Sequence, residues 1–268
     1  MKITISPDYK KNEVVNDFVC ELAHTFEKEG TILYNERNII KSYVLDNTDI
    51  PLNKVVVKRY KSPNLIQRIA YSFFRSSKAE RAFNNATELR KREIDTPKEI
   101  AHIEQWKNGL FLYGYYISDS DDAPPIREKL IELEDFDQTM ARDFAAFVVK
   151  LHEKGILHHD LNSTNVLYHP YEGRYKFSVI DINRMDFYSG GNLISKKKRF
   201  ENLTRFTGRM DLFEFVLRHY AQERGWNVEE TVKAAIKQKN RHDEQWRKRK
   251  TFLRKLSFKK KKECYPMG

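Results

Sequence analysis

The sequence predicts an α+β fold in which a small, β-rich lobe comes before a mainly helical lobe. Short runs of β-branched and aromatic residues dominate residues 1–117, and helical periodicity dominates residues 118–240. A basic tail follows over residues 241–268. The chain has 268 residues, of which 40% are hydrophobic and 13% aromatic, so it is long enough for two lobes with a buried core.

The first region predicts a small sheet with one helix packed on it. Residues 31–46 and 53–61 are rich in β-branched and aromatic side chains and predict strands. The turn residues between them are Asp46, Asn47, Asp49 and Pro51. A helix with an apolar stripe is predicted over residues 77–93, and an aromatic strand over residues 109–117.

The second region predicts helices around a pair of short strands. Helical periodicity covers residues 138–154, 196–224 and 228–239. Gly155 is the expected stop of the first helix. Between the first two helices, two apolar pairs predict short strands on either side of a hairpin; the pairs are Val166-Leu167 and Val179-Ile180.

The excess positive charge is concentrated in the tail. The chain has a formal net charge of +11, and residues 241–268 alone contribute +8, with eleven basic and three acidic side chains. The rest of the chain therefore does not have the composition of a nucleic-acid-binding protein, and we expect no nucleic-acid partner.

The cysteines and the N-terminus indicate a cytoplasmic protein. The two cysteines, Cys20 and Cys264, stand at opposite ends of the sequence, so neither a disulfide framework nor a zinc-binding spacing is expected. No signal-peptide pattern and no run of about 18 apolar residues is present. We expect a soluble or peripheral protein on the side of the membrane where it was made.

The segment HHDLNSTN, residues 158–165, matches the protein-kinase catalytic loop H-R-D-L-x-x-x-N, with His159 in place of arginine. Phosphoryl transfer explains this spacing, because a carboxylate must accept the proton of the attacking hydroxyl while an amide reaches Mg²⁺ on the phosphates. Asp160 is therefore the predicted catalytic base, and Asn165 a predicted metal ligand. Asp181 follows an apolar pair, as the aspartate of D-F-G does, and is the second predicted metal ligand.

Lys58 ends the run Val55-Val56-Val57 and matches the lysine that neutralises the phosphates of ATP. Its acidic partner on the following helix is either Glu80 or Glu88, and we prefer Glu80 as the nucleotide-site residue because it is nearer the helix start. No G-x-G-x-x-G loop covers the phosphates; only Gly30 precedes the first predicted strand.

Each of these residues also has an ordinary structural interpretation. Taken singly, Asp160 is typical of a helix or turn cap, Asn165 of a turn, and Lys58 of a solvated strand. Their occurrence together, in order and on the expected elements, favours a protein-kinase-like two-lobed fold that uses ATP and Mg²⁺. His158 is expected to form structural hydrogen bonds rather than to act in catalysis.

The chain resembles the bacterial lipopolysaccharide kinases, the Kdo/WaaP group, and is nearest to the Kdo kinases. The resemblance covers about residues 55–205 and is carried by four segments: VVVKRYKSPNLIQRIAYSFFRSSKAERAFNNA, IDTPKEIAHIE, GILHHDLNSTNVL and VIDINRMDF. It implies ATP-dependent phosphorylation of an inner-core sugar, namely Kdo attached to lipid A. Ala82 stands near the position where some members carry the helix glutamate.

Two features favour a substrate other than protein. No proline lies between Pro170 and Pro266, so the A-P-E motif that closes a peptide-binding segment is absent. Only 87 residues follow Asp181, which leaves little room for helices that dock protein. The alternatives are a kinase-like enzyme for another small hydroxylated substrate or for protein, and a non-catalytic pseudokinase scaffold.

The tail segment RKRKTFLRKLSFKKKK, residues 247–262, interleaves basic and apolar side chains. A solvated tail is the plain interpretation, but this pattern favours an anchor on an anionic membrane surface. Together with a lipopolysaccharide or lipid A–Kdo glycolipid substrate, it predicts a cytoplasmic enzyme that is peripheral on the inner face of the bacterial inner membrane.

Overall fold

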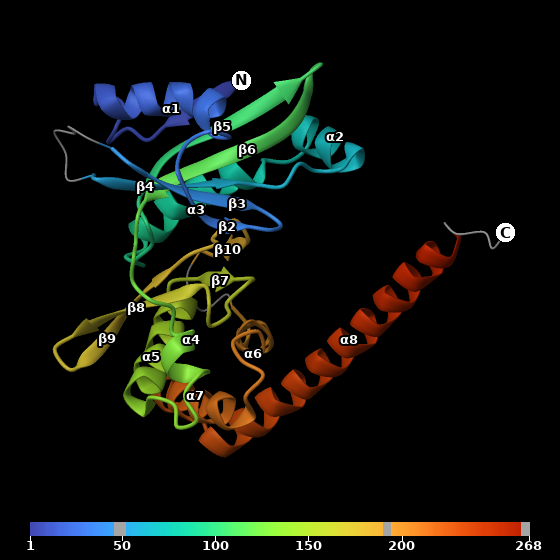
Figure 1. Ribbon diagram of the computed structural model, residues 1–268. Coiled ribbons are helices and arrows are strands. Elements are labelled where there is room, and N and C mark those ends of the chain that lie inside the picture. Colours follow the sequence, from blue (N-terminus) through green and yellow to red (C-terminus); the bar gives the residue numbers. More distant parts are fainter. Residues whose placement is uncertain (46–51, 190–193, 264–268) are drawn as a thin grey trace. The chain divides into compact units, whose positions relative to one another are not determined.

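The computed structural model describes residues 1–45, 52–189 and 194–263, with side chains as far as Thr251 (Figure 1). The chain forms two compact units. Unit 1 consists of Met1–Ile126, His158–Asp160 and Thr164–Asp186. Unit 2 consists of Arg127–Leu157, Leu161–Ser163 and Phe187–Gly268. The turn predicted at residues 46–51 lies outside the described residues.

The main feature of unit 1 is a six-stranded sheet in the order β1-β5-β6-β4-β3-β2, in which every pair is antiparallel. Its strands are β1 (Lys2–Ile5), β2 (Thr31–Asn35), β3 (Ile39–Val44), β4 (Lys54–Arg59), β5 (Glu99–Lys107) and β6 (Leu110–Asp119). The register places Lys58 of β4 between Ile40 of β3 and Tyr116 of β6. The phosphate-binding candidate therefore sits on an inner strand of the sheet.

Alternation along β4 gives the sheet two different faces. Val55 and Val57 are fully buried in one hydrophobic cluster, together with three residues of helix α1 (Glu13–Thr25). The α1 residues are Val15, Val19 and Leu22. Since successive side chains of a strand point to opposite faces, Val56 and Lys58 face away from this cluster.

Helix α3 (Lys78–Lys91) lies on the other face of the sheet and begins at Ser77, whose hydroxyl accepts a hydrogen bond from the Glu80 N–H at 3.1 Å. Its buried apolar residues are Ala79, Ala82, Phe83, Ala86 and Leu89. The helix packs closely, because a Cβ at Gly114 of β6 would lie only 3.0 Å from the Cβ of Ala79. A larger residue at this position would crowd α3 against the sheet.

A hairpin next to the sheet brings two candidate site residues together. It consists of β8 (Val166–Tyr171) and β9 (Arg174–Val179), and it turns at Glu172 and Gly173, which both have positive φ. Val166 pairs with Val179, so the residues just outside the hairpin, Asn165 and Ile180, are neighbours. The Ile180 N–H donates to the Asn165 carbonyl at 3.0 Å. Two further short strands, β7 (Ile156–His158) and β10 (Met185–Phe187), form a sheet of their own.

Unit 2 is built from helices: α4 (Arg127–Leu130), α5 (Gln138–Glu153), α6 (Lys196–Leu203), α7 (Met210–Glu223) and α8 (Val228–Glu263). Buried aromatic side chains fill its core, and the rings of Phe144 and Phe206 are 4.4 Å apart. Buried His152 has a partner for each ring nitrogen, the Tyr220 hydroxyl at 2.8 Å and the Asn202 Oδ1 at 3.0 Å. None of the helices described is both long and apolar enough to cross a membrane.

Several elements differ from the prediction. The strand predicted over residues 31–46 is two strands, β2 and β3. The helix predicted over residues 196–224 is two helices, and between them the Arg209 N–H donates to the Thr207 hydroxyl at 2.9 Å, a local bond that competes with helix formation. Helix α8 continues to Glu263, so most of the predicted tail is helical.

Candidate active site

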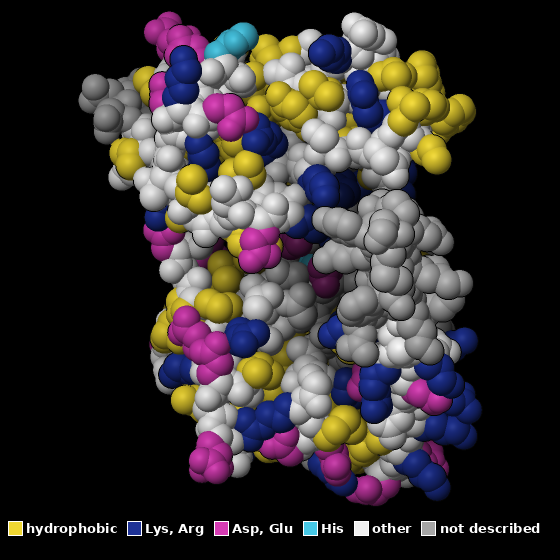
Figure 2. Space-filling model, turned by 45° about the vertical axis from the view of Figure 1, so that its right-hand side comes forward, with side chains coloured by type: hydrophobic (Ala, Val, Ile, Leu, Met, Phe, Trp, Pro, Cys, Tyr) yellow, Lys and Arg dark blue, Asp and Glu magenta, His cyan; other side chains and the backbone are white. Residues whose placement is uncertain are grey.

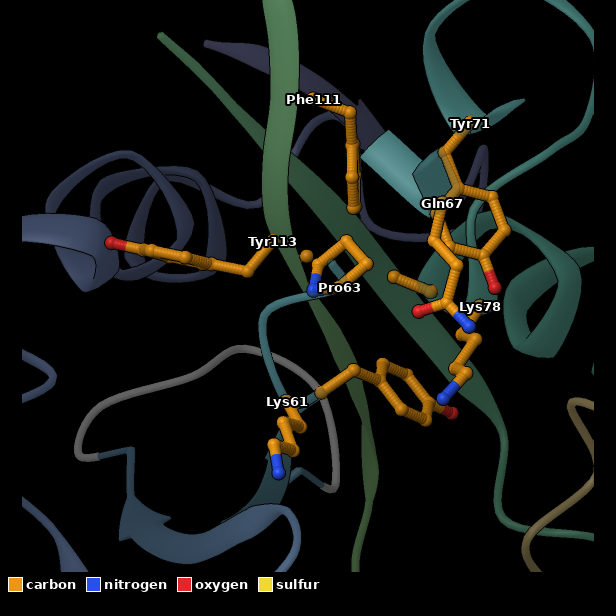
Figure 3. Close-up of a pocket in the computed structure, with 10 residues that line it drawn as sticks. Lys61, Pro63, Gln67, Tyr71, Lys78, Phe111 and Tyr113 are labelled. Atoms are coloured by element: carbon orange, nitrogen blue, oxygen red, sulfur yellow. The ribbon is translucent and has the colours of Figure 1, made fainter. Parts of the chain in front are cut away.

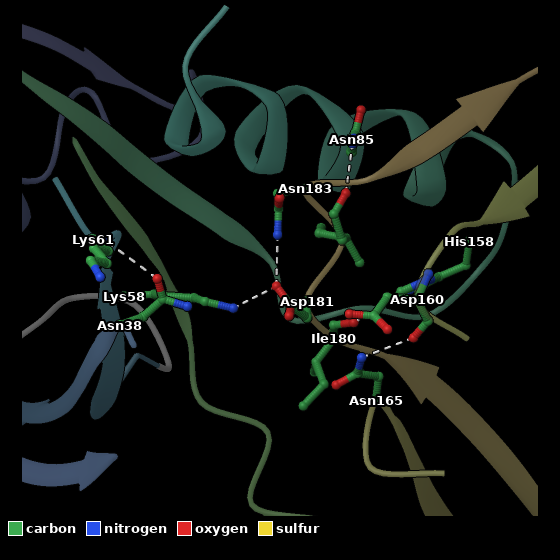
Figure 4. Close-up of polar contacts among 11 residues, drawn as sticks. Asn38, Lys58, Lys61, Asn85, His158, Asp160, Asn165, Ile180, Asp181 and Asn183 are labelled. Atoms are coloured by element: carbon green, nitrogen blue, oxygen red, sulfur yellow. Dashed lines mark hydrogen bonds and ion pairs between the residues drawn. The ribbon is translucent and has the colours of Figure 1, made fainter. Parts of the chain in front are cut away.

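The loop that follows β7 is held by a buried histidine. His158 is fully buried; its Nδ1 accepts a hydrogen bond from the Asp160 N–H at 3.1 Å, and its Nε2 lies 3.0 Å from the Ile180 carbonyl (Figure 4). Because Nδ1 accepts, Nε2 carries the proton and donates it to that carbonyl. Burial lowers the pKa of His158, which favours the neutral ring that this pattern needs. The contacts agree with a structural role for His158.

Asn165 is oriented by the same loop. Its amide Nδ2 donates to the Asp160 carbonyl at 2.9 Å, five residues earlier in the chain. With the nitrogen held in this way, Oδ1 is the amide atom available to a cation. Asp160 and Asn165 are therefore joined within one short loop, as the spacing of the motif predicts.

Asp181 occupies a left-handed backbone position, with φ of 55°. Its Oδ1 accepts from the Lys58 Nζ at 2.5 Å and from the Asn183 Nδ2 at 2.7 Å. Burial by itself raises the pKa of the carboxyl, but the charge and hydrogen bond of Lys58 outweigh it and hold the pKa below its usual value. Asp181 is therefore ionised at neutral pH, as a ligand of a divalent cation must be.

The segment around Asp181 is fastened to α3 and to the chain that follows it. The Asn85 Nδ2 of α3 donates to the Ile182 carbonyl at 2.6 Å (Figure 4). The Thr96 hydroxyl donates to the Val179 carbonyl at 2.8 Å. These bonds join residues more than eighty positions apart in the sequence.

Lys58 has no acidic partner on α3 among the residues that the structure describes. Glu88 instead pairs with Arg92 at 2.8 Å, one turn along its own helix. Glu80 lies near buried His102, where its charge acts against the lowering of that pKa by burial. The role predicted for Glu80 at the nucleotide thus remains a prediction, and the structure pairs Lys58 with Asp181.

Basic side chains lie on the same face of α3 as Asn85, which contacts the segment around Asp181. Lys78 and Arg81 stand seven and four positions before Asn85, so the three share one side of the helix. Burial, followed by the charges of Arg37, Arg184 and Arg81, lowers the pKa of Lys78. The Nε of Arg81 is buried and has no hydrogen-bond partner among the described atoms. Sequence reasoning missed this cluster, although its signal, two basic residues at helical spacing, was present.

A cavity of about 520 Å³ in unit 1 is lined by Lys58, Asn165 and Asp181. Four apolar side chains line another part of it: Ile40, Val56, Leu167 and Ile180. A volume of this size is typical of small-molecule sites, and the combination of apolar walls with a lysine and a carboxylate suits a nucleotide.

The oxygen atoms of Asn165 and Asp181 suit Mg²⁺ bound together with phosphate better than a metal ion held by protein ligands alone. Within the described part of the chain, no group of three His, Cys, Asp or Glu side chains is arranged to hold a metal ion. Asn165 and Asp181 supply one amide and one carboxylate oxygen at the same cavity. Mg²⁺ commonly binds to one or two such ligands and completes its shell with phosphate oxygens and water.

The model of the protein family described as "Lipopolysaccharide kinase (Kdo/WaaP) family" matches residues 34–227 of this chain. A 3-deoxy-D-manno-octulosonic acid kinase of Haemophilus influenzae (strain 86-028NP) is 24% identical over 151 residues, which is 54% of this chain and 61% of that protein. A probable serine/threonine-protein kinase of Dictyostelium discoideum is 36% identical over 85 residues, which is 28% of this chain and 9% of that protein.

A solved structure described as WaaP in complex with acyl carrier protein has the same fold, with a TM-score of 0.60 and 13% sequence identity. The match covers 91% of this chain and 99% of that one. It confirms the predicted kinase-like fold, with a sheet region followed by a mainly helical region. The chain spans less than two thirds of the length of both curated relatives. Because the family description covers most of the sequence, this chain belongs to the lipopolysaccharide kinase (Kdo/WaaP) family.

Proposed function

We propose that the protein transfers the γ-phosphoryl group of ATP to a hydroxyl of an inner-core lipopolysaccharide sugar, namely Kdo attached to lipid A. The observation that carries this proposal is the convergence of Lys58, Asn165 and Asp181 on one cavity, with the amide of Asn165 bonded to Asp160. Phosphoryl transfer depends mainly on positioning and on neutralising charge, and this set supplies both.

Each residue has a defined task in this reaction. The Asp160 carboxylate accepts the proton of the sugar hydroxyl as its oxygen attacks the γ-phosphorus, and ADP leaves. Asn165 and Asp181 would hold Mg²⁺, which would neutralise charge on the phosphates. Lys58 then exchanges its contact with Asp181 for the phosphate oxygens. The apolar walls of the cavity accommodate the adenine ring.

Two observations support an acidic sugar as the acceptor. The Haemophilus relative is named for 3-deoxy-D-manno-octulosonic acid, whose carboxylate is negative at neutral pH. The basic group on α3, with Arg81 lacking a partner for its Nε, supplies positive charge on the side of the helix that faces the Asp181 segment. An anionic acceptor would satisfy both the charge and the open donor.

Mass spectrometry of lipid A–core from cells with and without the gene tests the proposal. The expected result is a species with one additional phosphate on Kdo in the presence of the gene. An unchanged core, despite production of a folded protein that turns over ATP, would redirect the proposal to another small hydroxylated substrate or to protein. Loss of ATP turnover in Asp160→Ala separates an enzyme from a pseudokinase scaffold, in which turnover would be absent from the start.

We also propose that the protein works at the inner face of the bacterial inner membrane. The tail segment 247–262 continues helix α8, and its apolar residues from Phe252 onward lie outside the described side chains. Sedimentation with anionic liposomes, comparing the full chain with a chain that ends at Asn240, tests the contribution of the tail. Equal binding by the two proteins, or binding by neither, would contradict it.

A further inference from the structure

Helix α2 (Leu65–Phe73) turns its apolar side chains toward solvent. Ile66 is 79% exposed, Phe73 is 67% exposed, and Phe74 immediately after the helix is 83% exposed. Leu65 and Ile69 are exposed as well. At 3.6 residues per turn, positions 65, 66, 69 and 73 lie on one side of the helix. These four residues and Phe74 are called the α2 apolar face below.

The opposite side of α2 is attached to the sheet by polar contacts. The Arg68 Nε donates to the Phe111 carbonyl at 2.7 Å, and the Phe111 N–H donates to the Ser72 hydroxyl at 2.8 Å. The Tyr71 ring meets the Phe111 ring edge-on at 5.5 Å. Figure 3 shows the Tyr71 ring beside the pocket between α2 and the sheet, with the amide of Gln67 close to Lys78. The orientation of the helix is therefore fixed by specific bonds.

This arrangement reverses the usual pattern of a surface helix, which buries its apolar stripe. No residue of α2 is buried, whereas α3, the next helix in the chain, buries five apolar residues. The space enclosed between α2 and the sheet is about 20 Å³, roughly one water molecule, so the exposed side chains could not be accommodated there. An exposed apolar patch held in place in this way indicates an interaction surface.

The segment of chain that contains α2 carries only positive charges. Residues 61–79 contain Lys61, Arg68, Arg75 and Lys78 and no acidic residue. Lys61 and Arg75 are exposed. In Figure 2, a group of hydrophobic side chains with Lys and Arg beside it lies at the upper right of the molecule, over α2. Exposed apolar side chains with the exposed basic residues Lys61 and Arg75 at the two ends of the helix complement an anionic lipid surface.

We propose that α2 and Phe74 form a membrane-contact surface that inserts the α2 apolar face between the headgroups of an anionic bilayer. The face is a protruding helix side rather than a groove, and a bilayer needs no complementary shape to receive it. The proposal rests on the proposed function insofar as a glycolipid acceptor lies in such a bilayer. Phe74 is followed within four residues by Lys78, so the surface adjoins the basic cluster of the site.

Flotation with vesicles tests the proposal without ATP or turnover, so its outcome is independent of whether the acceptor is Kdo. The full chain is compared with the variant Ile66→Ser/Phe73→Ser/Phe74→Ser on phosphatidylglycerol-containing and purely phosphatidylcholine vesicles. The matched control is Val44→Ser/Leu133→Ser, which removes apolar side chains that are 72% and 47% exposed at other places. The tail is present in all proteins and contributes equally.

The expected result is a loss of about tenfold or more in partitioning to anionic vesicles for the α2 variant, because three inserting side chains are removed. The control should bind as the full chain does, and zwitterionic vesicles should bind every protein weakly. Unchanged anionic-vesicle binding by the α2 variant would overturn the proposal. So would normal vesicle binding combined with loss of self-association, which would assign the face to a second copy of this chain.

Site-specific fluorescence provides a second measurement that does not depend on a loss of binding. In Phe74→Trp, anionic vesicles should shift the emission to shorter wavelength, and brominated lipids should quench it. In Val44→Trp, neither change should occur once the signal of the native tryptophans is removed by replacing all three with phenylalanine in both variants. Equal quenching at the two positions, or quenching at neither while the protein is bound to vesicles, would exclude insertion through α2.

Discussion

The loop from His158 to Asn165 and the segment from Ile180 to Asn183 are neighbours, but different parts of the chain hold them. In the first, the Asp160 N–H and carbonyl are bonded by His158 and Asn165, within the loop itself. In the second, Asn183 bonds to Asp181 within the segment, and further bonds come from Lys58 of β4 and Asn85 of α3. Asp160 is thus bonded by residues of its own loop, whereas the metal-binding segment also depends on two remote elements, β4 and α3.

The difference indicates when a short sequence motif alone is enough to predict the geometry of a site. When the hydrogen bonds of a motif join residues within that motif, its sequence largely determines its geometry. A motif held from elsewhere, such as Asp181 with its positive φ, depends on the packing of β4 and α3. Four substitutions test the distinction, from the largest expected effect to the smallest.

Asp160→Asn should leave the loop intact and abolish its chemistry. The amide keeps the shape of the side chain but cannot accept the proton, and loss of a general base lowers the rate by about 10²- to 10⁴-fold. Nucleotide affinity and melting temperature should not change. Phosphotransfer measured with the glycolipid acceptor checks this, with Asp186→Asn as the control, since Asp186 is a partly exposed carboxylate near the loop that pairs with His159. Full activity of Asp160→Asn would remove the base from the mechanism.

Asp181→Ala should weaken nucleotide binding in the presence of Mg²⁺ more than Asn165→Ala does. A carboxylate attracts a divalent cation more strongly than an amide, so the loss should be at least the roughly tenfold effect typical of partners in a metal site. Titrations of ATP with and without Mg²⁺ measure it. If both variants lose the same affinity in both conditions, the two residues do not act through a metal.

His158→Ala removes the residue that joins the loop to the segment. It leaves the Ile180 carbonyl and the Asp160 N–H without their partners, and each buried unsatisfied group costs about 1–3 kcal/mol. Chemical denaturation should show a loss of about 2–6 kcal/mol for the two groups together. His169→Ala is the matched control, because its side chain is 45% exposed. A loss no larger than that of the control would mean that the two loops are independent.

The same histidine predicts a dependence of stability on pH. The pKa of His158 is lower in the folded protein than the ordinary value of 6.5, so the unfolded chain binds more protons at acidic pH. Its contribution is therefore fully present above pH 6.5 and is lost as the pH falls below that value. The free energy of unfolding of His158→Ala should decline less on acidification than that of the unsubstituted protein.

Asn85→Ala should have the smallest effect, on the segment alone. It removes one hydrogen bond to the Ile182 carbonyl, which corresponds to about 1 kcal/mol. Asn84→Ala, at an exposed position of the same helix, is the control and should be neutral. Hydrogen exchange of the amides of residues 180–184 should quicken only in Asn85→Ala. No change there would show that α3 does not hold the segment.

The sequence predicted those parts of the site whose geometry is local. Asn165 and Asp181 meet because the hairpin of β8 and β9 has the register that its apolar pairs indicate. The partner of Lys58 could not be foreseen, because it depends on how α3 is rotated on the sheet, and that rotation places Arg81 and Asn85 toward the site. Nothing in the spacing of Glu80 and Glu88 contains that information.

Two of the elements that were not predicted, β5 and α2, have side-chain patterns that depart from the usual rules of burial. β5 carries buried Glu99, His102 and Glu104, so it lacks the apolar alternation of an ordinary strand. Glu99 is tolerated there because Arg90 and Thr87 bond to its carboxylate, at 2.6 and 2.7 Å. α2 has the stripe of a helix, but it faces outward.

The close packing of α3 against Gly114 bears on how the protein could be regulated. Protein kinases are switched when a helix moves and makes or breaks its glutamate's pair with the phosphate-binding lysine. Here the lysine pairs with Asp181, and the helix rests where even a methyl group on Gly114 would crowd Ala79. Movement of α3 would not break the ion pair between Lys58 and Asp181. It would disrupt the close packing of Ala79 against Gly114. We therefore expect that α3 does not switch this protein by making or breaking a pair with Lys58.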